Sequence, residues 1–268
     1  MRILPHLAVT AILAAGALVH AQELEPEQAS LLEQAREAAV RYGDSLPDFL
    51  CTEMVHRAQD EQGNGRWRSL DKLTVKLTYF EHKEAYKLTE INGKTTALDF
   101  LHVGGALSTG EFGTRLAAIF DPKSQGEFHW KGWTTLRKRR AARFSYRIAR
   151  EHSIFLIQFG SVPVGPNAII VPYHGEVVVD EETHMVLRLT QEAEIPQSFP
   201  INANFSTVDY DFAEVGGRQY LLPTHAYTKT RSGRFVAENN MEFRDYRKFQ
   251  TETNITFDAP PDKAADKH

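Results

Sequence analysis

Two hydrophobic periods divide the chain, a helical one near the start and a strand-like one over most of the rest. From Glu23 to Tyr42 apolar residues recur three and four positions apart, which predicts an amphipathic helix. Gly43 and Pro47 end that pattern. From Phe49 onward apolar and polar residues alternate between turn residues, which predicts strands joined by short turns.

The expected strands share a period of two. They cover residues 73–79, 85–91, 143–148, 154–159, 175–179, 185–189, 205–212, 219–229, 235–249 and 255–257. The run at 154–159 is almost continuously apolar, and we interpret it as a strand buried on both faces. Short turns favour antiparallel neighbours. The pattern therefore predicts a single α+β domain built mainly on an antiparallel sheet.

A second helix is expected over 109–120, inserted between strands. Ser108 and Glu111 have the spacing of a capping box, and Pro122 ends the helical pattern. The apolar stripe of this helix consists of Phe112, Leu116, Ile119 and Phe120. Such a stripe is suited to covering one face of the sheet. The glutamate is then a helix cap and not a general acid.

The first residues have the layout of a secretory signal peptide. Arg2 precedes an apolar run from Leu7 to Val19, and small residues at Val19 and Ala21 suit a cleavage site. The alternative, a membrane anchor, would need a longer apolar run. We expect a signal peptide at 1–21 with cleavage near Ala21, a single domain at 22–260 and a disordered tail at 261–268. The mature protein is then periplasmic or secreted.

Charge and cysteine content exclude several classes. The chain has 31 Lys and Arg residues against 35 Asp and Glu, a net charge of −4, which argues against a nucleic-acid partner. Its one cysteine, Cys51, cannot form an internal disulfide, so the fold must depend on its hydrophobic core. After the leader, no segment is apolar enough to suggest a membrane span. We expect no cofactor.

Candidate catalytic groups are few. His174 and His184 flank a possible hairpin, but zinc needs three or four converging ligands, so we expect no metal site. Asp209 and Asp211 share one face of a strand. A glycosidase needs two carboxyl groups across a cleft, so a carboxylate-based hydrolase remains an alternative function.

A basic cluster stands out in this acidic chain. It consists of Arg137, Lys138, Arg139, Arg140, Arg143 and Arg147. One interpretation is a patch for an acidic partner or for anionic lipid headgroups. The other is a solvated strand edge, where cations discourage aggregation. Both interpretations place the first four residues at a hairpin turn.

Several segments resemble those of a group of secreted bacterial proteins of unassigned function. They are LPDFLCTE, GEFGTRLAAIF, FHWKGWTTLRKRRAARFSYRI, GEVVVDEETHMVLRLT, GGRQYLLPTHA and FRDYRKF. More distantly, the order of elements is similar to the lipoprotein-carrier (LolA-like) and RseB-like fold. That resemblance implies a strongly curved, mostly antiparallel sheet, an incomplete barrel, covered by an N-terminal helix and an inserted helix.

The resemblance also implies a function. The concave face of such a sheet can hold acyl chains or a hydrophobic peptide, so the leading hypothesis is a non-enzymatic envelope or secreted protein that binds a lipid-like ligand or a lipoprotein. The first alternative is a structural or interaction module without a small ligand. The candidate ligand-binding residues are Phe112, Leu116, Ile119, Phe120, Trp130 and Trp133.

Overall fold

A computed structural model describes residues 24–107, 110–160 and 167–249. The signal peptide at 1–21, Ser108, the strand at 255–257 and the tail at 261–268 lie outside the described residues. The helices are α1 (Pro26–Ser45) and α2 (Thr114–Phe120), with short 3-10 turns η1 (Phe100–His102), η2 (Pro122–Ser124) and η3 (Arg150–His152).

The strands account for most of the described chain. They are β1 (Phe49–Asp60), β2 (Arg68–Phe80), β3 (Lys83–Ile91), β4 (Lys94–Thr95), β5 (Glu127–Leu136), β6 (Arg139–Ile148), β7 (Leu156–Gln158), β8 (Ala168–Ile170), β9 (Tyr173–Asp180), β10 (Val186–Ala193), β11 (Ala203–Val215), β12 (Arg218–Ser232) and β13 (Phe235–Lys248).

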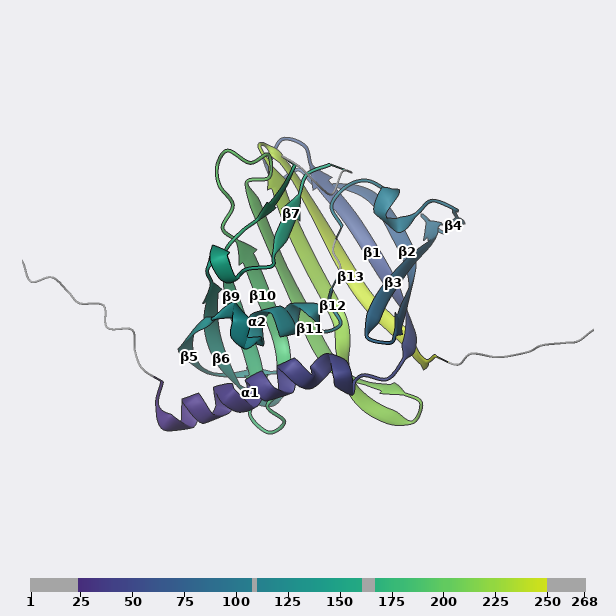
Figure 1. The fold of residues 1–268 in the computed structure, drawn as a ribbon. Coiled ribbons are helices and arrows are strands. Elements are labelled where there is room, and N and C mark those ends of the chain that lie inside the picture. The colour runs from purple at the N-terminus through teal and green to yellow at the C-terminus, as the bar shows by residue number, and fades with distance from the viewer. Residues whose placement is uncertain (1–23, 108–109, 161–166, 250–268) are drawn as a thin grey trace, which may run out of the picture.

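One large antiparallel sheet organises the molecule. Its 11 strands follow the order β4-β3-β2-β1-β13-β12-β11-β10-β9-β6-β5, so β4 and β5 form the two edges. The sheet is strongly curved, and both helices lie against its concave face (Figure 1). β7 and β8 form a separate two-stranded hairpin in front of this sheet. The expected α+β fold, a curved and unclosed antiparallel sheet with two covering helices, is confirmed.

The strands from the two ends of the chain meet in the middle of the sheet. β1 pairs with β13 over most of its length, from Phe49 opposite Lys248 to Asp60 opposite Val236. On its other side β1 pairs with β2. The remaining neighbours, apart from β6 and β9, follow one another directly along the chain. A single long-range ladder therefore joins the N-terminal and C-terminal halves of the sheet.

The first helix is close to its expected position. Glu25 and Gln28 form a capping box, and Pro26 occupies the first turn, where its missing N–H costs nothing. One face of α1 is buried against the sheet and α2. The buried side chains are those of Leu31, Leu32, Ala35, Ala39 and Tyr42.

Two expectations about local structure are wrong. α2 begins at Thr114 and not at 109, because Gly110 and Gly113 have φ values of 90° and 123°, which a right-handed helix cannot contain. The segment 154–159 is not buried on both faces. Its strand β7 pairs with β8, outside the large sheet, and Ile154 is 67% exposed.

Candidate functional site

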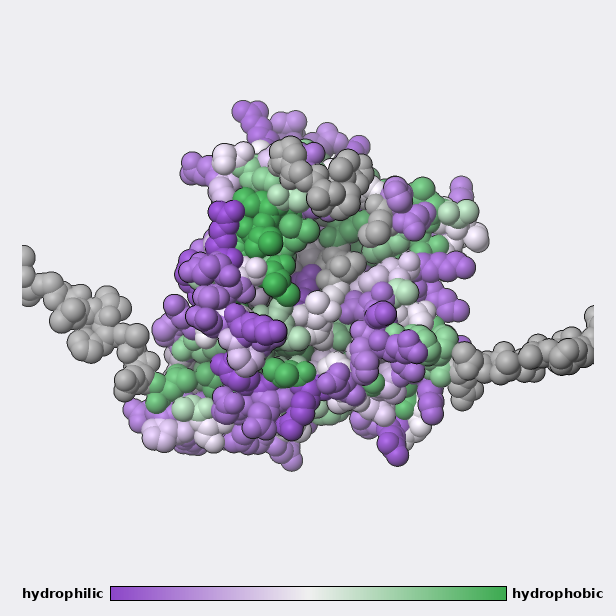
Figure 2. Space-filling model, in the orientation of Figure 1, coloured by the Kyte–Doolittle hydropathy of each residue, from purple (hydrophilic) through white to green (hydrophobic). Residues whose placement is uncertain are grey.

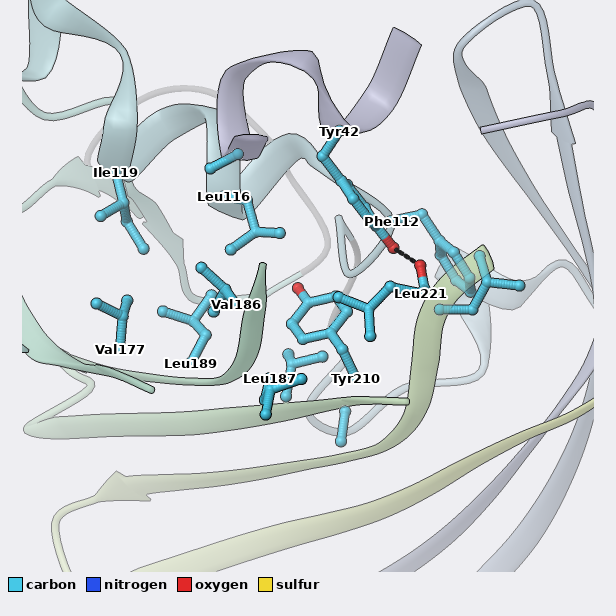
Figure 3. Close-up of a cluster of buried hydrophobic side chains, with 14 of the residues drawn as sticks. Tyr42, Phe112, Leu116, Ile119, Val177, Val186, Leu187, Leu189, Tyr210 and Leu221 are labelled. Atoms are coloured by element: carbon cyan, nitrogen blue, oxygen red, sulfur yellow. Dashed lines mark hydrogen bonds between the residues drawn. The ribbon is translucent and has the colours of Figure 1, made fainter. Parts of the chain in front are cut away.

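The helix α2 fills the concave face of the sheet. All four residues of its expected apolar stripe are buried, with exposed fractions of 0–2%: Phe112, Leu116, Ile119 and Phe120. Leu116 and Ile119 point toward Val177 and Leu189 of the sheet (Figure 3). These side chains therefore occupy the space that an acyl chain would need on this face.

Polar side chains from three other elements hold α2 and the turn before it. Arg36 of α1 donates a hydrogen bond to the carbonyl of Phe120 at 2.9 Å. Tyr210 of β11 donates to the carbonyl of Glu111 at 3.1 Å. Glu84 of β3 accepts from the backbone N–H groups on either side of Glu111, at 3.1 and 3.3 Å. α2 and the turn before it are thus held in place through their backbone as well as through their apolar side chains.

The two tryptophans among the candidate ligand residues lie apart from α2's buried stripe. Trp130 and Trp133 of β5 meet edge to face, with ring centroids 5.3 Å apart. They border a surface groove of about 430 Å³ between β5 and the start of α1. The groove is lined by Glu25, Pro26, Glu27, Gln28, Leu31, Trp130 and Trp133. The structure therefore separates the six candidate ligand residues into a buried set and a groove-lining pair.

A row of polar side chains crosses the concave face beyond the apolar part. Pairing across adjacent strands places its members directly opposite one another, one on each strand from β10 through β11, β12, β13 and β1 to β2. This polar row consists of Gln191, Ser206, Thr228, Asn239, Arg57 and Asp71. The neighbouring row, two residues along each strand, is entirely apolar: Leu189, Val208, Ala226, Met241, Val55 and Leu73.

Hydrogen bonds connect the polar row to the segment that precedes and begins α2. Asn239 donates to the carbonyl of Ala106 at 2.7 Å, and Arg57 donates to the carbonyl of Gly104. Arg115 of α2 donates to Ser206 at 2.8 Å. The row therefore faces the same side as α2. It marks where the inner surface changes from apolar to polar.

The sequence patterns did not reveal the polar row, because its members come from six strands that are distant along the chain. A local signal was nevertheless present. Arg57 stands two residues after Val55, and Asn239 stands two residues before Met241. Since side chains two residues apart on a strand share a face, each polar residue takes an inward position in an otherwise apolar alternation. A polar residue at such a position needs a buried partner, which here is the loop before α2 or a neighbouring strand.

A group of buried glutamates lies across the apolar row from the polar row, since Glu53 stands two residues before Val55 on β1. Glu53 and Glu111 are each 1% exposed, and Arg115 binds Glu111 at 3.2 Å. Burial, together with the negative charges of Glu111 and Glu84, raises the pKa of Glu53 well above its usual range. Within the described part of the chain, the Oε2 atom of Glu53 has no hydrogen-bond partner. The fold therefore favours the protonated, uncharged form of Glu53.

Replacing Glu53 by glutamine should make the protein more stable than the wild type, by a margin that grows as the pH rises. Because the folded pKa is raised, the folded state binds the proton more tightly, and the wild type loses stability from about pH 4.3 up to that raised pKa. Glutamine has no proton to lose. Urea unfolding should therefore give the wild type and Glu53→Gln equal free energies of unfolding at pH 4. Above neutral pH, the variant should be more stable than the wild type by about 1–3 kcal/mol.

The control for this experiment is Glu61→Gln. Glu61 is more than half exposed and pairs with Arg68 at the surface. Its replacement should leave the pH dependence of unfolding unchanged. A stability difference between wild type and Glu53→Gln that is constant with pH would contradict the assignment of the buried proton to Glu53.

The basic cluster is bound to acidic residues of neighbouring strands. Arg139 makes two hydrogen bonds to Asp180, at 2.9 and 2.7 Å, and this carboxylate is almost fully buried. Arg147 makes two bonds to Glu194, at 2.9 and 2.8 Å. These hydrogen bonds lower the pKa of Glu194. Both arginines therefore form bidentate pairs within the sheet.

The turn between β5 and β6 reaches the two candidate catalytic aspartates. Arg137 lies 3.4 Å from Asp209 and 3.2 Å from Asp211. Arg188 makes two more bonds to Asp209, at 2.7 and 2.9 Å. The two aspartates do share a strand face, as predicted. They act there as ion-pair partners of arginines.

The remaining cations of the cluster are more exposed. Arg140 stacks on Trp133, 3.9 Å from the ring centre, and also pairs with Glu181. Arg143 lies 4.0 Å from Glu176. Lys138 is exposed at the turn, and no ion pair joins it to another described residue. Most of the positive charge in this cluster is therefore balanced within the sheet.

The other candidate groups are not brought together. His174 and His184 lie at opposite ends of the β9–β10 hairpin, and His174 contacts Glu194 at 3.3 Å. Burial raises the pKa of the Cys51 thiol, which makes it a poor nucleophile. Among the described residues, no three His, Cys, Asp or Glu side chains form a group that could hold a metal ion.

Comparisons with known proteins give structural similarities only. No protein-family model matches the sequence, and the search of curated proteins gives no match. A LolA superfamily protein from Nitrosomonas europaea is 12% identical, covers 83% of this chain and 93% of its own, and has a TM-score of 0.38. A putative outer membrane lipoprotein-sorting protein domain from Vibrio parahaemolyticus is 9% identical, with 83% and 92% coverage and a TM-score of 0.35.

The MucA/MucB complex from Pseudomonas aeruginosa is also similar, at 9% identity, 80% and 93% coverage and a TM-score of 0.25. No helix in the described ranges is long and apolar enough to cross a bilayer.

Proposed function

We propose that this chain is a non-enzymatic interaction module of the cell envelope. It binds its partner through its outer surface and carries no small ligand inside the curved sheet. The leader-like sequence at 1–21 supports an envelope or secreted location. The balance of charges around Asp209 and Asp211 supports a role without catalysis.

One observation carries this proposal: in the described part of the chain, the apolar row of the concave face is buried, with exposed fractions of 0–3%. The apolar part of this face is covered by the buried stripe of α2, whose residues are at most 2% exposed. Beyond that part the face is crossed by the polar row, which is an unfavourable surface for an acyl chain. A ligand of the expected type would have to displace α2 together with its hydrogen bonds.

Native mass spectrometry of protein purified from its own envelope tests the proposal. The expected result is one mass, that of the polypeptide, unchanged after extraction with organic solvent. Loss of a lipid-sized mass on extraction would contradict it. A fluorescent fatty acid provides a second measurement, which should show no saturable binding to the wild type.

The double variant Leu116→Ala/Ile119→Ala is the matched comparison. It removes two side chains that fill the apolar part of the concave face, so it leaves space that is lined by Val177 and Leu189. We expect fatty-acid binding to appear in this variant. Equal binding by wild type and variant would mean that α2 opens readily and that the sheet is a carrier.

A second candidate function, a carrier of a hydrophobic ligand, is favoured by the groove at Trp130 and Trp133. Its volume of about 430 Å³ is within the range of small-molecule sites, and two aromatic rings line it. If it is a binding site, a hydrophobic ligand should quench tryptophan fluorescence in a saturable manner. Trp133→Ala should then abolish that change, whereas Trp67→Ala should retain it.

A further inference from the structure

The hairpin formed by β7 and β8 breaks the usual alternation of a surface hairpin. Leu156 and Ile170 are directly opposed, and they are 50% and 44% exposed. The adjacent pair, Ile157 and Ile169, faces the protein. A two-stranded hairpin on a solvated surface would carry polar side chains on its outer face. This hairpin is apolar on both faces.

Exposed apolar side chains also flank β7. Ile154 and Phe159, on either side of β7, are 67% and 43% exposed. Figure 2 shows a band of hydrophobic surface where Figure 1 places β7. No Asp, Glu, Lys or Arg occurs from Ser153 to Tyr173. The band therefore has no charged side chain of its own.

The inner face anchors the hairpin firmly to the body of the protein. Ile157 and Val171 are buried in a small cluster that is separate from the main core. The other buried members of this cluster are Ala193, Phe199 and Ile201. The exposed side chains of the outer face are thus presented from a fixed support.

The hairpin also satisfies much of its own backbone. Beyond the pairing of β7 with β8, Phe159 donates to the carbonyl of Asn167 at 2.7 Å. Val171 donates to the carbonyl of Phe155 at 3.1 Å. Backbone groups that are already paired lose little when they leave water, which is the main obstacle to placing non-helical chain in a lipid interface.

We propose that the outer face of the β7–β8 hairpin docks on a lipid bilayer, with Ile154, Leu156 and Ile170 entering the interfacial region. The proposal deepens the proposed function, since it names one partner of the interaction module. A protein partner would use hydrogen bonds and a polar rim. On this face Gln158 is the polar side chain within the described strands, so hydrocarbon is the better match.

This mode of docking differs from the headgroup patch suggested by the basic cluster. The arginines of that cluster are largely paired with acids, whereas the hairpin has no charge to pair. Binding through the hairpin should therefore not require anionic lipid and should resist salt. Binding through the cluster would show the opposite behaviour.

Co-sedimentation of the full mature chain with phosphatidylcholine vesicles tests the proposal. We expect binding that is retained at high salt, and the double variant Leu156→Asp/Ile170→Asp should weaken it by at least about tenfold. The matched control is Leu70→Asp/Phe235→Asp, whose side chains are 43% and 39% exposed elsewhere. This control should bind as the wild type does.

A second variant guards against misfolding of the aspartate variant. Leu156→Trp keeps the face apolar and should show tryptophan quenching by brominated lipids that exceeds the wild-type level. Absence of wild-type binding, equal binding by the aspartate variant, or a requirement for anionic lipid that salt abolishes would each overturn the proposal. It would also be overturned if the aspartate variant lost only self-association, since the occupant would then be a second copy.

These outcomes are independent of the test of the proposed function. A failure of vesicle binding with no lipid in the native mass spectrum would leave the interaction module intact and remove only the membrane partner. If the native mass spectrum shows a bound lipid while the protein still binds vesicles through the hairpin, the membrane partner stands and the proposal of a module without a small ligand falls.

Discussion

Phe112→Ala should lower the free energy of unfolding by about 3–5 kcal/mol, the cost of deleting a buried phenylalanine side chain. Phe112 is 1% exposed and lies among Phe49, Phe243 and Tyr246, with ring centroids 5.3, 5.4 and 6.3 Å away. Its loss leaves a cavity between α2 and the central strands. Urea unfolding followed by circular dichroism measures the change.

The control for this substitution is Phe235→Ala. Phe235 is 39% exposed at the start of β13, so its replacement should cost far less. A small effect at Phe112 would mean that this side chain spends much of its time away from the sheet. That outcome would favour a mobile cover and would count against the filled concave face on which the proposed function depends.

Asp71→Ala should destabilise the protein by about 3–5 kcal/mol, because it leaves a buried arginine without its counter-ion. Arg57 makes two hydrogen bonds of 2.6 Å to Asp71, and its side chain is 4% exposed. Among the described residues, the desolvated guanidinium would then keep its bond to the carbonyl of Gly104 and no other. Thermal and urea unfolding should both report the loss.

Two further variants separate burial from charge. Glu61→Ala removes the partner of Arg68 from an exposed pair and should cost less than about 1 kcal/mol. The double variant Arg57→Met/Asp71→Leu replaces the buried pair by apolar side chains and should recover much of the stability. Equal effects of Asp71→Ala and Glu61→Ala would contradict a desolvated pair at Arg57.

Local sequence patterns were sufficient to predict a strand and its buried face where the other face is solvated. The segment 73–79 alternates cleanly, and it lies within β2 with its odd-numbered residues buried. The helix at 109–120 was less predictable. Its apolar stripe was identified correctly, but two glycines in left-handed conformation delay the helix to Thr114. Periodicity reports which face is buried, and backbone conformation decides where an element begins.

Pairing between distant strands was beyond the reach of local patterns. Nothing in the alternation of 49–60 indicates that this strand lies beside 235–248. The polar row depends on such pairings, so it could not be assembled before the strand order was known. The run at 154–159 was misinterpreted for a related reason: burial on both faces requires layers on both sides, and this segment lies outside the large sheet.

The central position of the β1–β13 ladder has a consequence for how the chain acquires its structure. Residues that face each other in this ladder, such as Phe49 and Lys248, are separated by nearly the whole described sequence. The entropic cost of closing so large a loop slows folding. During synthesis, β1 has only β2 beside it until residues 235–248 have left the ribosome. The nascent chain therefore stays incompletely folded until β13 has been synthesised and can complete the sheet.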